Sequence, residues 1–174
     1  MSTAASGINM VADVIVRPRD EWLIDIFVPG IPAPQGSKMA RPIAKGRGEA
    51  KVYTGKVAMV ESSKHGVIEW RNDVRKAAED AWGKQPPLDD GLVMDIRFVR
   101  RRPVSAPKRR TPLAISRPDL SHLVRASEDA LTSAGVWVDD SRVVATYSSK
   151  RIAEIGERTG ARIRIRRVRP GEDV

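Results

Sequence analysis

Residues 118–148, PDLSHLVRASEDALTSAGVWVDDSRVVATYS, lead from a helix start through an amphipathic stretch and a turn into a strand-like segment. Apolar side chains over residues 120–134 recur at steps of three and four, which places them on one side of an α-helix. Pro118-Asp119 is a typical helix start, and Gly135 is a typical stop. The β-branched run over residues 143–148 then predicts a strand. This stretch therefore predicts a helix that packs its apolar face against a sheet.

The rest of the chain adds further strands and one more helix. We expect strands over residues 22–28, 92–99 and 161–168, a loop over 30–56, and a helix over 57–82 that Gly66 breaks or kinks. The order strand, helix, strand, helix, strand, strand predicts an α/β fold. In this fold a small mixed β-sheet packs against two helices.

The length and composition are typical of one folded domain. The chain has 174 residues, of which 41% are hydrophobic and 30% charged. We expect a flexible leader over residues 1–20, a domain over 21–169 and a C-terminal tail over 170–174. The start of the chain lacks the pattern of a signal peptide, and no apolar run approaches the roughly 20 residues of a membrane span. We therefore expect a cytoplasmic protein without a membrane partner.

The charge balance favours a polyanionic partner. Lys and Arg number 31 against 22 Asp and Glu, which gives a net charge of +9 and a pI near 10.3. Nucleic acid is the usual partner of so basic a domain, although ribosome-associated and membrane-surface proteins are basic as well. Residues 97–117 hold eight basic residues, three prolines and no acid, which predicts a mobile basic loop that contacts DNA; a solvated linker is the alternative.

Two groups of basic residues are candidates for nucleic-acid binding. The main group comprises Lys38, Arg41, Arg100, Arg101, Arg102, Lys108, Arg109, Arg110 and Arg117. The second, on the last expected strand, comprises Arg162, Arg164, Arg166 and Arg167. Both groups would gain affinity from the counterions that a bound phosphate backbone releases.

The lack of cysteine restricts the chemistry. The sequence contains no Cys and only two His, which excludes disulfides, thiol catalysis and an all-histidine zinc site. Metal chemistry must then rest mainly on carboxylates, which prefer Mg²⁺, with Mn²⁺ as the alternative.

The helix-to-turn segment resembles the RusA family of Holliday junction resolvases. Its parts PDLSHLVR, DAL and DDSRV are similar to the family pattern P-D-x-D-N-x-x-K, D-A-L and D-D-x-x-V. The loop GIPAPQGSK at residues 30–38 is similar to the family's G-x-P-x-P-x-G-S segment. The resemblance spans about residues 24–168. It implies a RusA-like fold and a homodimeric, magnesium-dependent endonuclease of a kind common in bacteriophages.

The resemblance also assigns site residues. Asp119 and Asp140, 21 residues apart, match the first and last catalytic aspartates, and Arg125 stands where the family usually has a lysine. Ser121 replaces the family's second aspartate, and His122 replaces its asparagine. The catalytic residues implied are Asp119, Asp140 and Arg125, and the metal-site residues are Asp119, Asp140, Asp139, Ser121 and His122.

These residues suit phosphodiester hydrolysis. Mg²⁺ held by carboxylates can position the attacking water and stabilise the leaving 3′ oxygen. Arg125 could balance charge on the phosphate, whereas Ser121 leaves the site one carboxylate short. Without the resemblance, Asp119 is read as a helix N-cap and residues 139–141 as an ordinary turn.

The function that the resemblance implies is the resolution of Holliday (four-way) junctions in branched DNA by paired symmetric nicks. A dimer suits this reaction because a two-fold junction needs two incisions. The alternative is a non-catalytic, basic nucleic-acid-binding protein that kept the resolvase fold, which the serine at position 121 favours.

Overall fold

The computed structural model describes residues 22–36, 38–46, 52–61 and 66–174. Its elements are β1 (Ile24–Pro29), β2 (Lys38–Lys45), β3 (Val52–Glu61), α1 (Val67–Trp82), β4 (Leu92–Arg100), α2 (Leu120–Ser133), the 3₁₀ turn η3 (Asp140–Arg142), β5 (Val143–Ile152) and β6 (Gly160–Arg167). The leader over residues 1–20 lies outside the described residues. Within the described part, no helix has the length and apolar character to cross a membrane.

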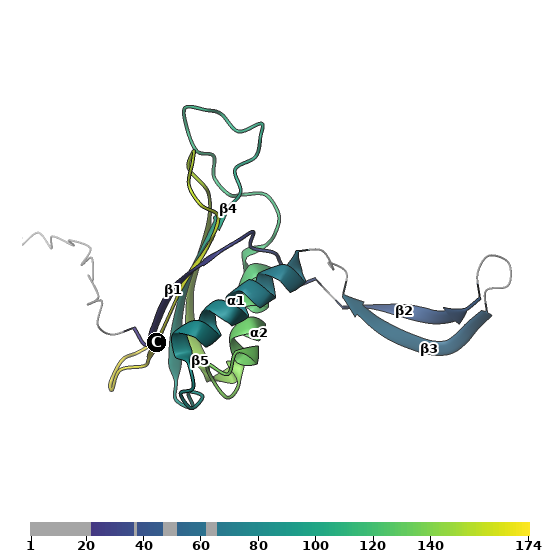
Figure 1. Ribbon diagram of the computed structural model, residues 1–174, viewed down its shortest axis with the longest axis horizontal. Coiled ribbons are helices and arrows are strands. Elements are labelled where there is room, and N and C mark those ends of the chain that lie inside the picture. Colours follow the sequence, from purple (N-terminus) through teal and green to yellow (C-terminus); the bar gives the residue numbers. More distant parts are fainter. Residues whose placement is uncertain (1–21, 37, 47–51, 62–65) are drawn as a thin grey trace, which may run out of the picture.

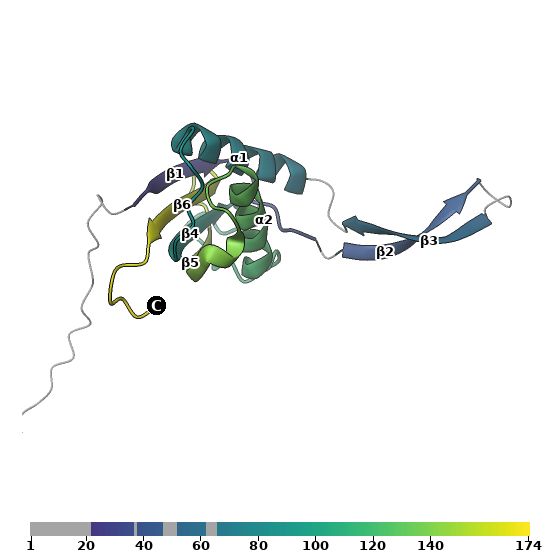
Figure 2. The ribbon, with the colours of Figure 1, turned by 90° about the horizontal axis from the view of Figure 1, so that it is seen from below.

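Four strands form a mixed sheet in the order β1-β6-β4-β5. The β4–β5 pair is parallel, whereas β6 pairs antiparallel with both β1 and β4. Helix α2 is the crossover that joins the two parallel strands, a connection that a tight turn cannot make. Both helices cover the same face of the sheet (Figure 2). The expected α/β fold, with a mixed sheet and two helices, is confirmed.

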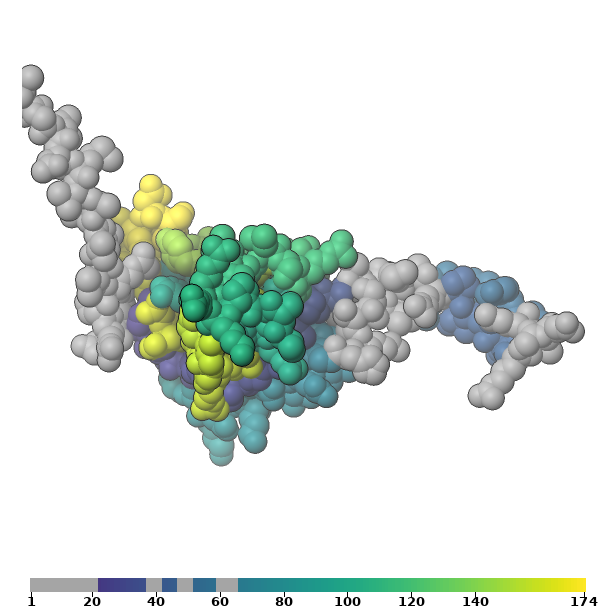
Figure 3. All heavy atoms as spheres, turned by 90° about the horizontal axis from the view of Figure 1, so that it is seen from above, coloured from purple at the N-terminus to yellow at the C-terminus, as the bar shows by residue number. Residues whose placement is uncertain are grey.

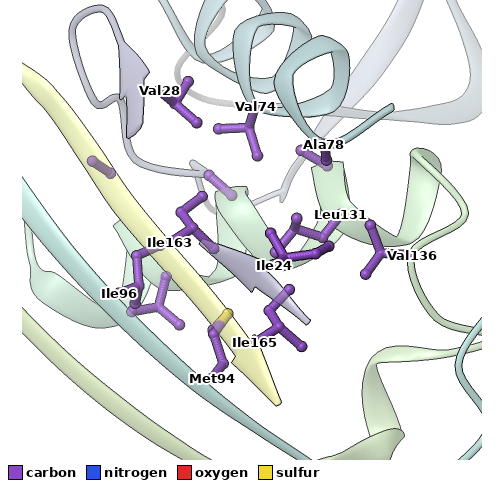
Figure 4. Packing of buried hydrophobic residues seen from close by; sticks show 14 of the residues in the cluster. Ile24, Val28, Val74, Ala78, Met94, Ile96, Leu131, Val136, Ile163 and Ile165 are labelled. Carbon is purple, nitrogen blue, oxygen red and sulfur yellow. The ribbon is translucent and has the colours of Figure 1, made fainter. Parts of the chain in front are cut away.

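The core lies between this face and the helices (Figure 4). Its sheet side includes Ile24, Val28, Met94, Ile96, Ile163 and Ile165, and its helix side includes Val74, Ala78 and Leu131. Each large side chain is at most 2% exposed, and burial of one such side chain contributes about 1.5–3 kcal/mol. This core fixes α2 against the sheet.

A β-hairpin replaces part of the expected loop and part of the expected first helix. Strands β2 and β3 pair antiparallel, with Val57 opposite Pro42, and stand away from the sheet (Figure 1). Helix α1 begins only at Val67, after Gly66 at a φ of 86°. The expectation of a loop over residues 30–56 and a helix from residue 57 was therefore wrong. Short apolar spacings fit both periods, and pairing between the two neighbouring segments decided the outcome.

Candidate active site

Asp119 is the residue before the first turn of α2. Its backbone is extended, with φ −71° and ψ 143°, and its side chain makes no capping hydrogen bond. Asp119 therefore occupies the expected N-cap position, but the expectation that its carboxylate caps the first turn was wrong. Since the carboxylate is exposed and not used by the helix, it is available to an outside ligand.

A cavity of about 500 Å³ opens beside Asp119, lined also by Pro34, Arg117, Pro118 and His122. Pro34 belongs to the GIPAPQGSK loop, and the backbone N–H of the next residue, Gln35, donates to the carbonyl of His122 at 3.0 Å. The fold thus places the GIPAPQGSK loop beside the PDLSHLVR segment at the start of α2.

The other two candidate aspartates, Asp139 and Asp140, lie just before β5. Asp139 accepts a hydrogen bond from the backbone N–H of Ser141 at 2.9 Å and so caps η3. Hydrogen bonding from Ser141 lowers the pKa of Asp139. The turn reading of this segment is confirmed, and Asp140 begins the turn with its side chain exposed.

The charge of Asp140 acts on Glu128, which lies in the second half of α2. Glu128 is half-buried, and its pKa is raised first by that burial and then by the charges of Asp140 and Asp129. Glu128 follows Asp119 by nine residues, which is roughly 13 Å along a helix axis. Within the described part of a single chain, no three His, Asp or Glu side chains are grouped closely enough to hold a metal ion. One chain therefore divides the expected carboxylates between two places along α2.

A polar stripe connects these two places. Ser121, Arg125 and Glu128 are spaced by four and then three residues, so they share one face of α2. Glu128 was not among the site residues predicted from the sequence. Its seven-residue spacing from Ser121 was the available signal, but most of the exposed face of α2 is polar, so this spacing did not single out Glu128.

The loop over residues 101–118 is folded around Arg102. That guanidinium donates to Thr111 Oγ1 at 2.7 Å and to the carbonyls of Pro107, Arg110 and Ala153. Arg100 likewise donates to carbonyls of this segment. Among the basic side chains of the loop, Arg101, Lys108, Arg109, Arg110 and Arg117 stay exposed. The guanidiniums of Arg100 and Arg102 are partly buried and bound to loop acceptors, so these two are less available to a DNA phosphate than the sequence predicted. Figure 1 shows the loop extending beyond the end of β4, and in Figure 3 the same loop, in green, faces the viewer.

The arginines of β6 are engaged by carboxylates. Arg162, Arg164 and Arg167 form ion pairs with Asp25, Asp95 and Asp90 at 2.7, 2.8 and 2.6 Å, respectively. The side chain of Arg166 is 0% exposed and binds Glu172. The expectation that Arg166 contacts DNA was wrong, because a buried guanidinium cannot reach a phosphate. Lys38 and Arg41 belong to β2, and their side chains lie outside the described part of the structure.

Comparison with known proteins agrees with the motifs. A family profile described as "Endodeoxyribonuclease RusA" matches residues 40–166. The "Crossover junction endodeoxyribonuclease rusA" of Enterobacteria phage 82 is 46% identical over 57 residues, or 33% of this chain and 41% of the relative. The protein of that name from Escherichia coli K12 is 43% identical over 61 residues, or 35% of this chain and 44% of the relative. The chain thus aligns with less than half the length of these relatives. Because the profile covers most of the chain, including α2, η3 and β5, this protein belongs to the RusA endodeoxyribonuclease family.

Proposed function

We propose that this protein is a divalent-metal-dependent endodeoxyribonuclease that resolves four-way DNA junctions by paired symmetric nicks. The observation that carries this proposal is the uncapped carboxylate of Asp119. It lies at the position of the family's first catalytic aspartate, beside a cavity and next to a basic loop. Related proteins bear the name crossover junction endodeoxyribonuclease, which supports DNA as the substrate.

The active form in this proposal is a homodimer paired along β5. Strand β5 lies at the edge of the sheet, runs for ten residues without proline, and exposes Val144 and Tyr147. Such an edge is a ready template for another strand. Two-fold symmetry makes two copies of one edge pair antiparallel, so the start of one β5 lies beside the end of the other.

This pairing brings the separated carboxylates toward each other. The end of β5 adjoins Asp119, because Lys150 Nζ donates to the carbonyl of Pro118 at 2.7 Å. The start of β5 adjoins Asp140. Asp119 of one copy therefore approaches Asp140 of the partner subunit, and a dimer contains two such sites. Two symmetric sites match the two incisions that a four-way junction needs.

The donor set suits a hard cation, although one chain does not assemble it. Carboxylate oxygens are the ligands that Mg²⁺ and Mn²⁺ accept most readily. In the proposed dimer Asp119, Asp140 and Asp139 would hold the cation, and Ser121 and His122 would lie beside it. A bound Mg²⁺ would supply charge stabilisation to the phosphate. Arg125 lies on the polar stripe of α2 with Ser121 and Glu128. Its planar guanidinium stays protonated, so it would bind a phosphate oxygen without acting as a proton donor in the reaction.

The alternative function is binding of branched DNA without cleavage. Ser121 favours it, because a serine hydroxyl offers the metal no negative charge where the family usually has an aspartate. The exposed basic loop serves this function equally well.

A nicking assay separates the two functions. A synthetic four-way junction, labelled on each strand in turn, is incubated with the protein in Mg²⁺, Mn²⁺ or EDTA, with a linear duplex of the same sequence as control. We expect paired nicks at symmetric positions of the junction only in the presence of a divalent ion. Tight junction binding without nicks in any metal would establish the binding protein instead. Equal nicking of the linear duplex would contradict junction selectivity.

A further inference from the structure

Two cations at the ends of neighbouring parallel strands converge on the three residues before Asp119. Arg100, the last residue of β4, donates to the carbonyl of Ser116 at 3.1 Å and to that of Arg117 at 2.6 Å. Lys150 in β5 donates through Nζ to the carbonyl of Ser116 at 3.0 Å and to that of Pro118 at 2.7 Å. Three consecutive carbonyls are thus held by two charged side chains, and Ser116 accepts from both.

This segment needs such a clamp because it lacks regular backbone pairing. Residues 101–118 belong to no helix or strand, and Pro118 has no N–H to donate. Asp119 in turn makes no side-chain capping bond with its own helix that would orient it. The direction of the Asp119 carboxylate therefore depends on the path of the preceding backbone.

We propose that Arg100 and Lys150 are positioning residues that set the Asp119 carboxylate for metal binding by clamping the carbonyls of residues 116–118. This inference rests on the proposed function, since it assigns a role toward the metal that Asp119 would help to hold. Hydrogen bonds from ionised donors are roughly twice as strong as neutral ones, so four of them hold this short segment firmly. Burial lowers the pKa of Arg100, a cost that its two carbonyl partners offset.

Arg102 offers a matched control. It clamps the same loop through Thr111 and through the carbonyls of Pro107 and Arg110, and none of these hydrogen bonds reaches residues 116–118. Loss of Arg102 loosens the distal loop, whereas loss of Arg100 or Lys150 loosens the segment that leads into Asp119. A general effect of loop disorder would be the same in all three variants.

The test compares Arg100→Gln, Lys150→Met, Lys150→Arg and Arg102→Gln with the wild type. Single-turnover nicking of a four-way junction is measured across a Mg²⁺ titration, and junction binding is measured in EDTA. Small misplacement of a catalytic group costs up to about a hundredfold in rate, so we expect Arg100→Gln and Lys150→Met to lose about ten- to a hundredfold or to need several-fold more Mg²⁺. Their junction affinity should stay within about threefold of the wild type, since the exposed loop cations that dominate binding are untouched. Lys150→Arg, which keeps a charged donor, should recover most of the loss.

A second readout does not depend on nicking. Mn²⁺ broadens the amide resonances of residues near its site, so the broadening of the Leu120 amide reports metal at Asp119. Arg100→Gln and Lys150→Met should weaken it, and Arg102→Gln should leave it at the wild-type level. If the wild type never nicks a junction but shows this pattern, the proposed function fails and the positioning role stands. Wild-type broadening in Lys150→Met, or an equal loss in Arg102→Gln, overturns the inference.

Discussion

Arg166 and Glu172 form a two-point ion pair that ties the C-terminal tail to the sheet. Arg166 Nη1 and Nη2 donate to the two carboxylate oxygens of Glu172 at 2.7 and 2.6 Å, and the arginine side chain is 0% exposed. Hydrogen bonding from Arg166 lowers the pKa of Glu172 to about 2. The segment expected to be a plain C-terminal tail therefore supplies the counter-charge of a buried cation.

Glu172→Gln should destabilise the protein, because it leaves the Arg166 charge buried without its carboxylate. We expect the melting temperature at pH 7 to fall by roughly 5–10 °C. The pKa of Glu172 in the folded state lies below its ordinary value. The stability that the ion pair contributes is therefore present above about pH 4.5 and is lost as the pH falls toward 2. Thermal melts from pH 7 to pH 3 measure it. Asp173→Asn, which changes the exposed neighbouring acid, is the control. A melting temperature equal to that of the control would contradict the structural role of the pair.

A mixing experiment tests the shared active site. Asp119→Asn and Asp140→Asn should each abolish nicking while preserving junction binding, since each removes metal-binding charge. After subunit exchange about half of the dimers are mixed, and each mixed dimer keeps one site with both aspartates intact. We therefore expect single-strand nicks to reappear in the mixture, without paired cleavage. If each site lay within one chain, both sites of a mixed dimer would lack an aspartate and no nicks would return.

The serine at position 121 should leave the metal site under-charged. Ser121→Asp restores one carboxylate, so we expect nicking at several-fold lower Mg²⁺ than in the wild type. Ser121→Ala should behave like the wild type if the hydroxyl has no part in the site. The measurement is a Mg²⁺ titration of junction nicking for the three proteins. Slower cleavage by both variants would show instead that the hydroxyl itself is productive.

Glu128 should make stability depend on pH in the opposite sense from Glu172. Burial and the charge of Asp140 raise the pKa of Glu128, so the folded state resists its ionisation. Ionisation of Glu128 therefore lowers the stability of the folded state. This loss of stability is absent below about pH 4.5 and grows as the pH rises through the raised pKa of Glu128. Glu128→Gln removes the charge and should raise the melting temperature by a few degrees at pH 7 but not at pH 4. A shift of the same size at both pH values would point to packing rather than charge.

The exposed loop cations should dominate the salt dependence of DNA binding. We expect Arg101, Lys108, Arg109 and Arg110, each changed to Gln, to weaken junction binding together. They should reduce the slope of log affinity against log salt by up to about 3.6, or about 0.9 for each phosphate that is no longer neutralised. The same assay on Arg162→Gln is the control, because Arg162 is held by Asp25 through two hydrogen bonds of 2.7 Å. An unchanged slope in the loop variant would exclude the loop as the binding surface.

Local pattern was enough for the main body of the fold. The apolar period over residues 120–134 predicted α2, and the β-branched runs predicted β1, β4, β5 and β6 to within a few residues. These signals are strong because one face of each element must be buried, and the burial repeats with the period of that element. The spacing of Asp119 and Asp140 was also visible in the sequence, because motif order is a property of the chain alone.

The tertiary structure decided the features that depend on a partner elsewhere in the chain. Strands β2 and β3 form because they pair with each other, and neither carries a period that excludes a helix or a loop. The β6 arginines look like a basic stripe in the sequence, but their carboxylate partners come from β1, β4, the segment before β4 and the C-terminal tail. The proximity of Glu128 to Asp140 and the separation of both from Asp119 likewise follow from how η3 packs along α2. Sequence spacing records the distance along the chain, whereas charge pairing and metal binding depend on the distance through space, which only packing sets.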